Sequence, residues 1–188
     1  MEKFSEVGLR VLSDLKNTAQ YLPAGIITGV IVLFIFSVWT VVSEKKSLLK
    51  VIFRRKSIPL FLMAVYVTVM IYKVFLSREL GAVSRVNLLF LGTWRGVGVL
   101  HYFIENVIMF IPMGVLLPLC FEQGKKWYLT VLFGCALSIW IECTQYLFSV
   151  GVMELDDVLM NTLGTFLGWL SWRYVHVRCG NSRRRSSR

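Results

Sequence analysis

Acids and amides stand near one end of three apolar segments in the C-terminal half of the chain. Burying a charged residue at the centre of a membrane helix is unfavourable, by about 2.5–3.5 kcal/mol on insertion scales. A chain that places several such residues at one level is therefore expected to use them in a polar site. The residues are Glu105 and Asn106, then Glu142 and Gln145, then Asp156, Asp157 and Asn161.

Carboxylates and amides in this arrangement suit three different roles. We favour a pocket that binds an amphiphilic ligand through hydrogen-bond donors or a cation on its head. Alternatively, Glu142 with Asp156 or Asp157 holds a divalent cation such as Mg²⁺, in an enzyme that acts on a lipid phosphate. The sequence shows no His cluster or nucleophile motif for such an enzyme. The third role is a structural cluster, since interhelical hydrogen bonds contribute about 0.6 kcal/mol on average.

The composition is that of a membrane protein. The 188 residues are 56% hydrophobic and 17% charged, whereas soluble domains are about 25% charged. A membrane-spanning helix needs about 20 mostly apolar residues. The sequence therefore predicts an all-α membrane protein with one bundle of about five transmembrane helices and no second domain. The spans are expected at about 22–43, 58–77, 105–121, 127–148 and 157–177.

The basic residues set the expected orientation of the bundle. They gather at 45–56, at 125–126 and from 173 to the C-terminus, three regions that lie on one side of a five-helix chain. The positive-inside rule makes that side cytoplasmic, so the N-terminus is expected outside. All three polar groups then lie at the outer ends of their helices. Because basic juxtamembrane residues also attract anionic lipids, membrane lipids are expected partners and nucleic acid is not.

Helical phase places the polar residues on shared faces. Gly134, Ser138, Glu142 and Gln145 follow steps of four, four and three in the fourth span. In the fifth span the corresponding face carries Asp157, Asn161, Gly164 and Gly168. Small residues let helix backbones approach closely. The two faces are therefore predicted to pack together beneath a polar pocket.

The flanking segments have distinct characters. Residues 1–20 have the apolar spacing of an amphipathic helix, which we expect to lie on the outer membrane surface. The connection at 77–104 is rich in glycine and apolar residues, and an interfacial or re-entrant segment fits it best. Within it Arg85 and Arg95, or Lys73 just before it, are candidates to neutralise the acids. The basic tail at 178–188 is expected to be disordered.

Four motifs in order give the chain a resemblance to the VanZ-like family of small bacterial membrane proteins. The segment 84–88 is similar to the family's RxxNL segment, and it contains Arg85 and Asn87. Residues 106–114 resemble NxxxFxPxG, residues 138–145 resemble SxxxExxQ, and residues 156–164 resemble DDxxxNxxG. The family usually has an arginine shortly before the paired acids, close to the position of Gly151 in this chain.

The resemblance implies a multi-pass protein of the bacterial cytoplasmic membrane with a role at the cell envelope. The founding member of the family is associated with resistance to the lipoglycopeptide teicoplanin. For this chain the resemblance implies that the outward-facing pocket meets a lipoglycopeptide or a lipid-linked peptidoglycan precursor. The expected ligand contacts are the seven polar residues named first, with Arg85 and Asn87 from the outer connection.

Overall fold

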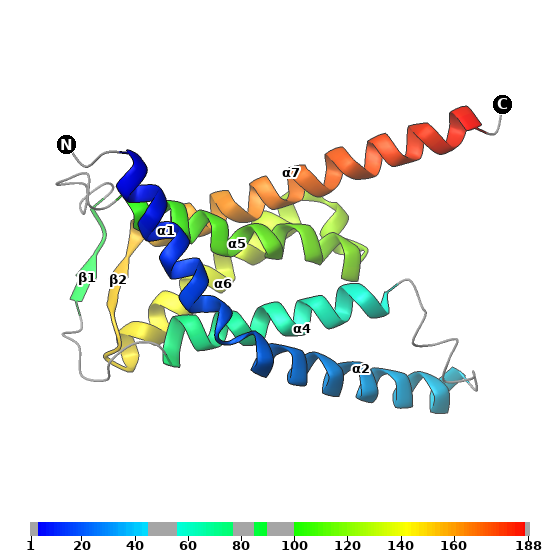
Figure 1. Cartoon of the computed structure of the whole chain (residues 1–188), viewed down its shortest axis with the longest axis horizontal. Coiled ribbons are helices and arrows are strands. Elements are labelled where there is room, and N and C mark those ends of the chain that lie inside the picture. Colours follow the sequence, from blue (N-terminus) through cyan, green and yellow to red (C-terminus); the bar gives the residue numbers. More distant parts are fainter. Residues whose placement is uncertain (1–3, 45–55, 77–84, 90–99, 187–188) are drawn as a thin grey trace.

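A computed structural model of the chain describes residues 4–44, 56–76, 85–89 and 100–186, and Figure 1 shows their arrangement. The described part is almost entirely helical. The elements are α1 (Phe4–Ala19), α2 (Leu22–Glu44), α4 (Ser57–Ile71) with the π-helical turn η1 (Tyr72–Leu76), β1 (Arg85–Asn87), α5 (Leu100–Cys120), the short 3₁₀ turn η3 (Gln123–Lys125), α6 (Trp127–Leu147), β2 (Val152–Glu154) and α7 (Leu155–Ser186).

The prediction of an all-α membrane protein is confirmed. Among the described residues, four helical stretches are long and apolar enough to cross a membrane: Leu22–Ser43, Ser57–Phe75, Leu100–Cys120 and Trp127–Leu147. The third stretch begins five residues before the predicted span, so Glu105 and Asn106 lie inside a helix and not at its start. The fifth predicted span falls within α7, which is more polar than these four. Its passage through the membrane and the orientation of the bundle stay predictions.

Close backbone packing between α5 and α7 forms the centre of the bundle, where the two helices run side by side (Figure 1). A Cβ atom added at Gly164 would overlap the carbonyl oxygen of Val107. One at Gly168 would overlap the carbonyl oxygen of Ile111 in the same way. Glycine is required at both positions because only a residue without a side chain allows this approach.

The interface between α6 and α7 is partly as predicted. Asn161 donates a hydrogen bond from its Nδ2 to the Oγ of Ser138 at 2.8 Å, and Gly134 lies against the side chain of Thr165. Gly164 and Gly168, however, face α5 and not α6. The predicted face of α7 therefore divides between two neighbours, because α7 lies in the angle between α5 and α6.

The helices α2 and α4 form a separate pair. Gly25 lies close to Val65, and Gly29 lies close to the ring of Phe61. Most of the outer surface of α2 is exposed and apolar; Phe34 and Trp39, for example, are largely uncovered. In a membrane this surface faces lipid.

Helix α1 crosses the bundle near one of its ends (Figure 1). Val7 and Val11 are buried, whereas Leu12 is exposed. After a turn at Gln20 and Tyr21 the chain enters α2, and the Tyr21 ring stacks on that of Tyr72. The predicted helix is present, and its location on the outer membrane surface stays a prediction.

The strands β1 and β2 were not foreseen. They pair in parallel, with Arg85 opposite Val152 and Asn87 opposite Glu154. Three residues are too few for an alternating pattern to stand out in a sequence. The pairing attaches part of the predicted interfacial connection to the segment between α6 and α7; the rest of that connection, at 77–84 and 90–99, lies outside the described residues.

The end of the chain also differs from the prediction. Helix α7 continues to Ser186, through most of the segment expected to be disordered. Elongating an existing helix is much easier than starting one, and basic residues stabilise the C-terminal end of a helix through its dipole. Both effects favour the observed extension.

Candidate functional site

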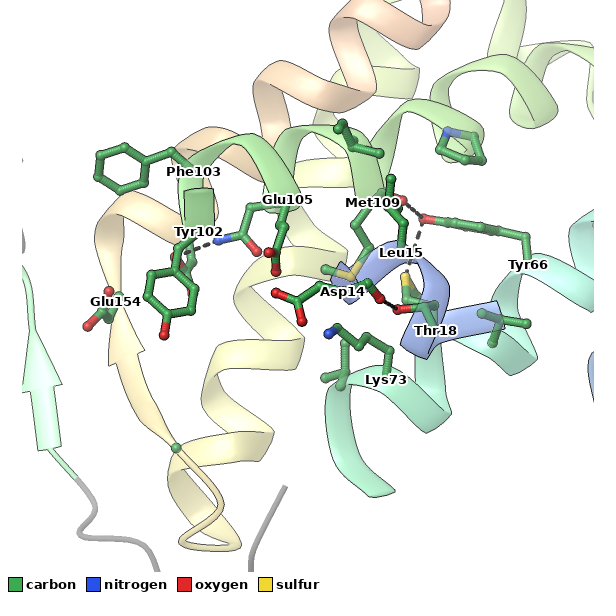
Figure 2. A pocket seen from close by; sticks show the side chains of 18 of the residues that line it. Asp14, Leu15, Thr18, Tyr66, Lys73, Tyr102, Phe103, Glu105, Met109 and Glu154 are labelled. Carbon is green, nitrogen blue, oxygen red and sulfur yellow. Dashed lines mark hydrogen bonds between the residues drawn. The ribbon is translucent and has the colours of Figure 1, made fainter. Parts of the chain in front are cut away.

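A cavity of about 720 Å³ lies between α1, α4 with η1, α5 and β2. Its volume is typical of a small-molecule binding site, for which about 300–1,000 Å³ is usual. Figure 2 shows the side chains that point into it. Helix α1 contributes Asp14, Leu15 and Thr18; α4 and η1 contribute Tyr66, Val69, Met70, Lys73 and Val74; α5 contributes Tyr102, Phe103, Glu105, Asn106, Ile108, Met109 and Pro112; and Gly151, Val152, Glu154 and Asp157 complete the lining.

One end of the cavity is charged. The carboxyl groups of Asp14 and Glu105 are close enough to influence each other electrostatically, and the charge of Lys73 also acts on Glu105. In Figure 2 the Asp14 carboxyl lies between the other two charged groups. The Oε1 atom of Glu105 is buried and has no hydrogen-bond partner among the described residues. Three helices thus bring two acids and one base together, and Lys73 is one of the three bases predicted to neutralise the acids.

A hydrogen bond between α5 and α7 forms the wall next to this charged end. Asn106 donates from Nδ2 to the Oδ1 of Asp157 at 2.6 Å. The Asn106 amide is thereby fixed in orientation, and the Asp157 carboxylate receives a donor. Glu154 of β2 also lines the cavity, and its backbone N–H donates to the Oε2 of Glu142 at 3.1 Å. Glu142 therefore holds the strand that forms the cavity rim.

The opposite walls are apolar and surround one half-buried tyrosine, Tyr66. The Tyr66 hydroxyl donates to the Met109 carbonyl oxygen at 3.0 Å and lies 3.3 Å from the Met70 sulfur. Pro112 interrupts the α5 hydrogen-bond ladder because it has no N–H. The tyrosine fastens α4 to α5 just before this interruption, beside the side chains of Val69 and Ile108.

Three of the seven polar residues predicted for the pocket line this cavity: Glu105, Asn106 and Asp157. The other four, which are Glu142, Gln145, Asp156 and Asn161, do not line it, and each is at most 2% exposed. Gln145 donates to the Val74 carbonyl at 3.3 Å. These four side chains are buried outside the cavity lining. Gln145 and Asn161 bond to neighbouring helices, and Glu142 bonds to β2, as a structural role would require.

The two site residues expected from the outer connection belong to β1. Asn87 does not line the cavity, and the side chain of Arg85 lies outside the described part of the structure. Their backbone pairs with β2, and the Asn87 side chain accepts the N–H of Leu89 at 3.3 Å. Arg95 lies outside the described residues. Gly151, which stands close to where the family usually has an arginine, lines the cavity. An arginine side chain at this position would fill part of the space that glycine leaves open.

Sequence reasoning missed the contribution of α1. Asp14 and Thr18 lie three and four turns into a helix that appeared to be a surface helix, and no motif marks them. Only Asp14 could have been singled out, because it is an acid beside the apolar positions Val11 and Leu15 of the same helix. Tyr66 and Tyr102 were missed as well, since aromatic residues in apolar spans are common.

The described residues contain no group of three or more His, Cys, Asp and Glu side chains that could hold a metal ion. A divalent cation held by Glu142 with Asp156 or Asp157 stays a prediction. Of the four cysteines, the three at 120, 135 and 143 are free thiols within the described part of the chain.

Comparison with known proteins settles the family. The model of the family described as VanZ/LLP1 matches residues 26–176, which include α5, α6, β2 and most of α7. The chain belongs to the VanZ/LLP1 family. It is 32% identical over 111 residues to Protein VanZ of Enterococcus faecium, an alignment that covers 57% of this chain and 68% of that protein. No solved structure matches the chain. The matched region begins after α1, so Asp14 lies outside it.

Proposed function

We propose that this VanZ-family protein is a multi-pass protein of the bacterial cytoplasmic membrane that binds an amphiphile in the described cavity. The ligand would be a lipid-linked cell-wall precursor or a lipoglycopeptide antibiotic. Binding would contribute to resistance against lipoglycopeptides such as teicoplanin. The observation that supports this proposal is the two-ended lining, with charged groups at one end and apolar walls at the other.

An amphiphile suits this cavity better than a fully polar or fully apolar molecule. Asp14, Glu105 and Lys73 would leave a pure hydrocarbon with charged groups that it cannot pair, which is unfavourable. A sugar or an ion alone would leave the walls of Val69, Met70 and Ile108 without an apolar partner. A molecule with a polar head and an apolar tail satisfies both ends.

A cavity-filling substitution tests the proposal. Leu15 lines the cavity and is about half exposed, so a larger side chain there is expected to occupy the binding space without unfolding the protein. Leu12, on the same helix, is exposed and does not line the cavity. A strain that lacks the gene is complemented with wild-type protein, Leu15→Trp or Leu12→Trp, and its teicoplanin susceptibility is measured.

We expect wild-type protein and Leu12→Trp to restore tolerance, and Leu15→Trp to fail although it reaches the membrane in equal amount. Immunoblotting of membrane fractions checks the amount. Full tolerance with Leu15→Trp would show that the cavity is not where the protein acts. Equal loss with both variants would point to a requirement for the surface of α1 instead.

A further inference from the structure

We infer that the head of the bound amphiphile is an ammonium group, with Asp14 and Glu105 as the residues that determine this specificity. The inference rests on the proposed function and deepens it, because it assigns a chemical class to the molecule that enters the cavity. Four observations carry it: the formal charge, the free acceptor, the lining beyond the charged end and the origin of Asp14.

Ionising both carboxyls at the polar end leaves one negative charge to be neutralised. With both carboxyls ionised, Asp14 and Glu105 bring two negative charges against the single positive charge of Lys73. Neighbouring like charges disfavour joint ionisation unless a cation is near. One additional positive charge between the acids removes this repulsion. A head group with one ammonium supplies that charge, whereas a phosphate or carboxylate head would add to the excess.

The hydrogen-bonding groups lead to the same conclusion. The Oε1 atom of Glu105 is buried and has no donor among the described residues. The other charged lining residues, Glu154 and Asp157, are also acceptors, and Lys73 is the one basic residue in the described lining. An ammonium carries three donors and no acceptor. It therefore fits a wall that offers acceptors and has few donors to give.

The lining beyond the charged end determines what must be attached to the ammonium. Tyr66 already uses its hydroxyl as a donor to the Met109 carbonyl, so that part of the wall has no polar group to offer a second head. Val69, Met70 and Ile108 continue the apolar surface. A long alkyl chain joined directly to the ammonium occupies both parts of the cavity.

Asp14 brings the specificity from outside the region that matches the family, since that match begins at residue 26. Helix α1 is held against the bundle by the buried side chains of Val7 and Val11. This packing places Asp14 and Thr18 over the cavity, and Thr18 donates to the Asp14 carbonyl oxygen at 2.7 Å. One of the two residues that determine the preference for an ammonium therefore lies on α1, a helix outside the matched region.

The test compares three probes that share a twelve-carbon chain: dodecylammonium, dodecanol and dodecyl phosphate. The full-length protein is held in an uncharged steroidal detergent, and binding is measured by native mass spectrometry and by the shift in Tm that ligand binding produces. The variants are Asp14→Asn and Glu105→Gln. The control is Glu122→Gln, which removes the same charge from an exposed turn far along the chain from the cavity lining.

We expect one molecule of dodecylammonium to bind at least about tenfold more tightly than dodecanol, because hydrogen bonds to charged groups are the stronger class. Asp14→Asn and Glu105→Gln should each remove most of this preference. Glu122→Gln should behave as wild type. Unliganded Tm values close to wild type show that the variants are folded, and saturable binding of one dodecanol molecule shows that the cavity is intact.

Two results would overturn the inference, and they differ in what they say about the proposed function. If dodecanol or dodecyl phosphate binds as well as dodecylammonium, and Leu15→Trp blocks that binding, the cavity takes amphiphiles but does not select an ammonium. If none of the three probes binds, the proposed function fails together with the inference.

Discussion

Replacing Gly164 with alanine should separate α5 from α7 and weaken the bundle. The added Cβ would lie 3.0 Å from both the backbone carbonyl carbon and the Cα of Val107, and closer still to its carbonyl oxygen. Carbon atoms in favourable contact are about 3.5–4.0 Å apart. The two backbones must therefore move apart by at least about 0.5 Å. Neither neighbour is a flexible side chain that can turn away.

The expected magnitude follows from overpacking in a rigid interface. Inserting a methyl group into a well-packed core costs typically about 1–3 kcal/mol, and the intrinsic helix preference for alanine over glycine returns about 1 kcal/mol. We expect a net loss of up to about 2 kcal/mol. The separation should also lengthen the hydrogen bond between Asn106 and Asp157, now 2.6 Å, so ligand binding in the cavity should weaken as well.

The measurement is equilibrium unfolding of the purified protein in mixed micelles, with Gly8→Ala as the matched control. A Cβ at Gly8 would have nothing within 4 Å, so that substitution should be neutral or stabilising. If Gly164→Ala proves as stable as the control, the backbone contact between α5 and α7 does not hold the bundle together. The packing argument would then be wrong.

Three further substitutions test other contacts. A double-mutant cycle of unfolding, with alanine at Asn161 and at Ser138, removes the hydrogen bond between them. It should reveal a coupling free energy of about 0.6 kcal/mol. No coupling would exclude a structural role for the pair. Tyr66→Phe, which deletes the hydroxyl between α4 and α5, should lower the free energy of unfolding by about 0.5–1.5 kcal/mol, and an unchanged value would show that this bond does not fasten the two helices. The hydrogen bond from Lys125 lowers the pKa of the Glu122 carboxyl. The stabilising effect of this bond is present at a pH above the ordinary carboxyl pKa, and it is lost as the pH falls through the lowered pKa of Glu122. Lys125→Ala should therefore raise the pKa of Glu122, measured by NMR, while the Tm at neutral pH stays the same because the group is fully exposed.

The spans and one helix interface were predictable because their signals are local. Long apolar runs require no knowledge of tertiary structure, and four of them became helices of spanning length. The steps of three and four residues that join Ser138 to Glu142 and Gln145 placed these side chains on one face, and the structure buries all three. Helical phase also brought Asn161 to Ser138.

The residues that line the cavity were less predictable, because a sequence does not distinguish a polar residue that is buried between helices from one that lines a cavity. Glu142 and Glu105 are both acids near the end of an apolar segment, yet one holds the backbone of β2 and the other lines the cavity. The difference depends on how α5 and α6 are rotated about their axes. Asp14 could not be assigned for a related reason, since a surface helix has no fixed partner until it docks.

The cavity lies along the seam between two differently packed halves. On one side α5 and α7 are joined by direct backbone contact; on the other, α4 meets α5 through side-chain bonds such as that of Tyr66. Side-chain bonds can be exchanged for bonds to a ligand more easily than close backbone packing can be separated. For an amphiphile of the kind proposed above, we expect a lateral route inward from the bilayer between α4 and α5, and the bound molecule would then hold the two halves together.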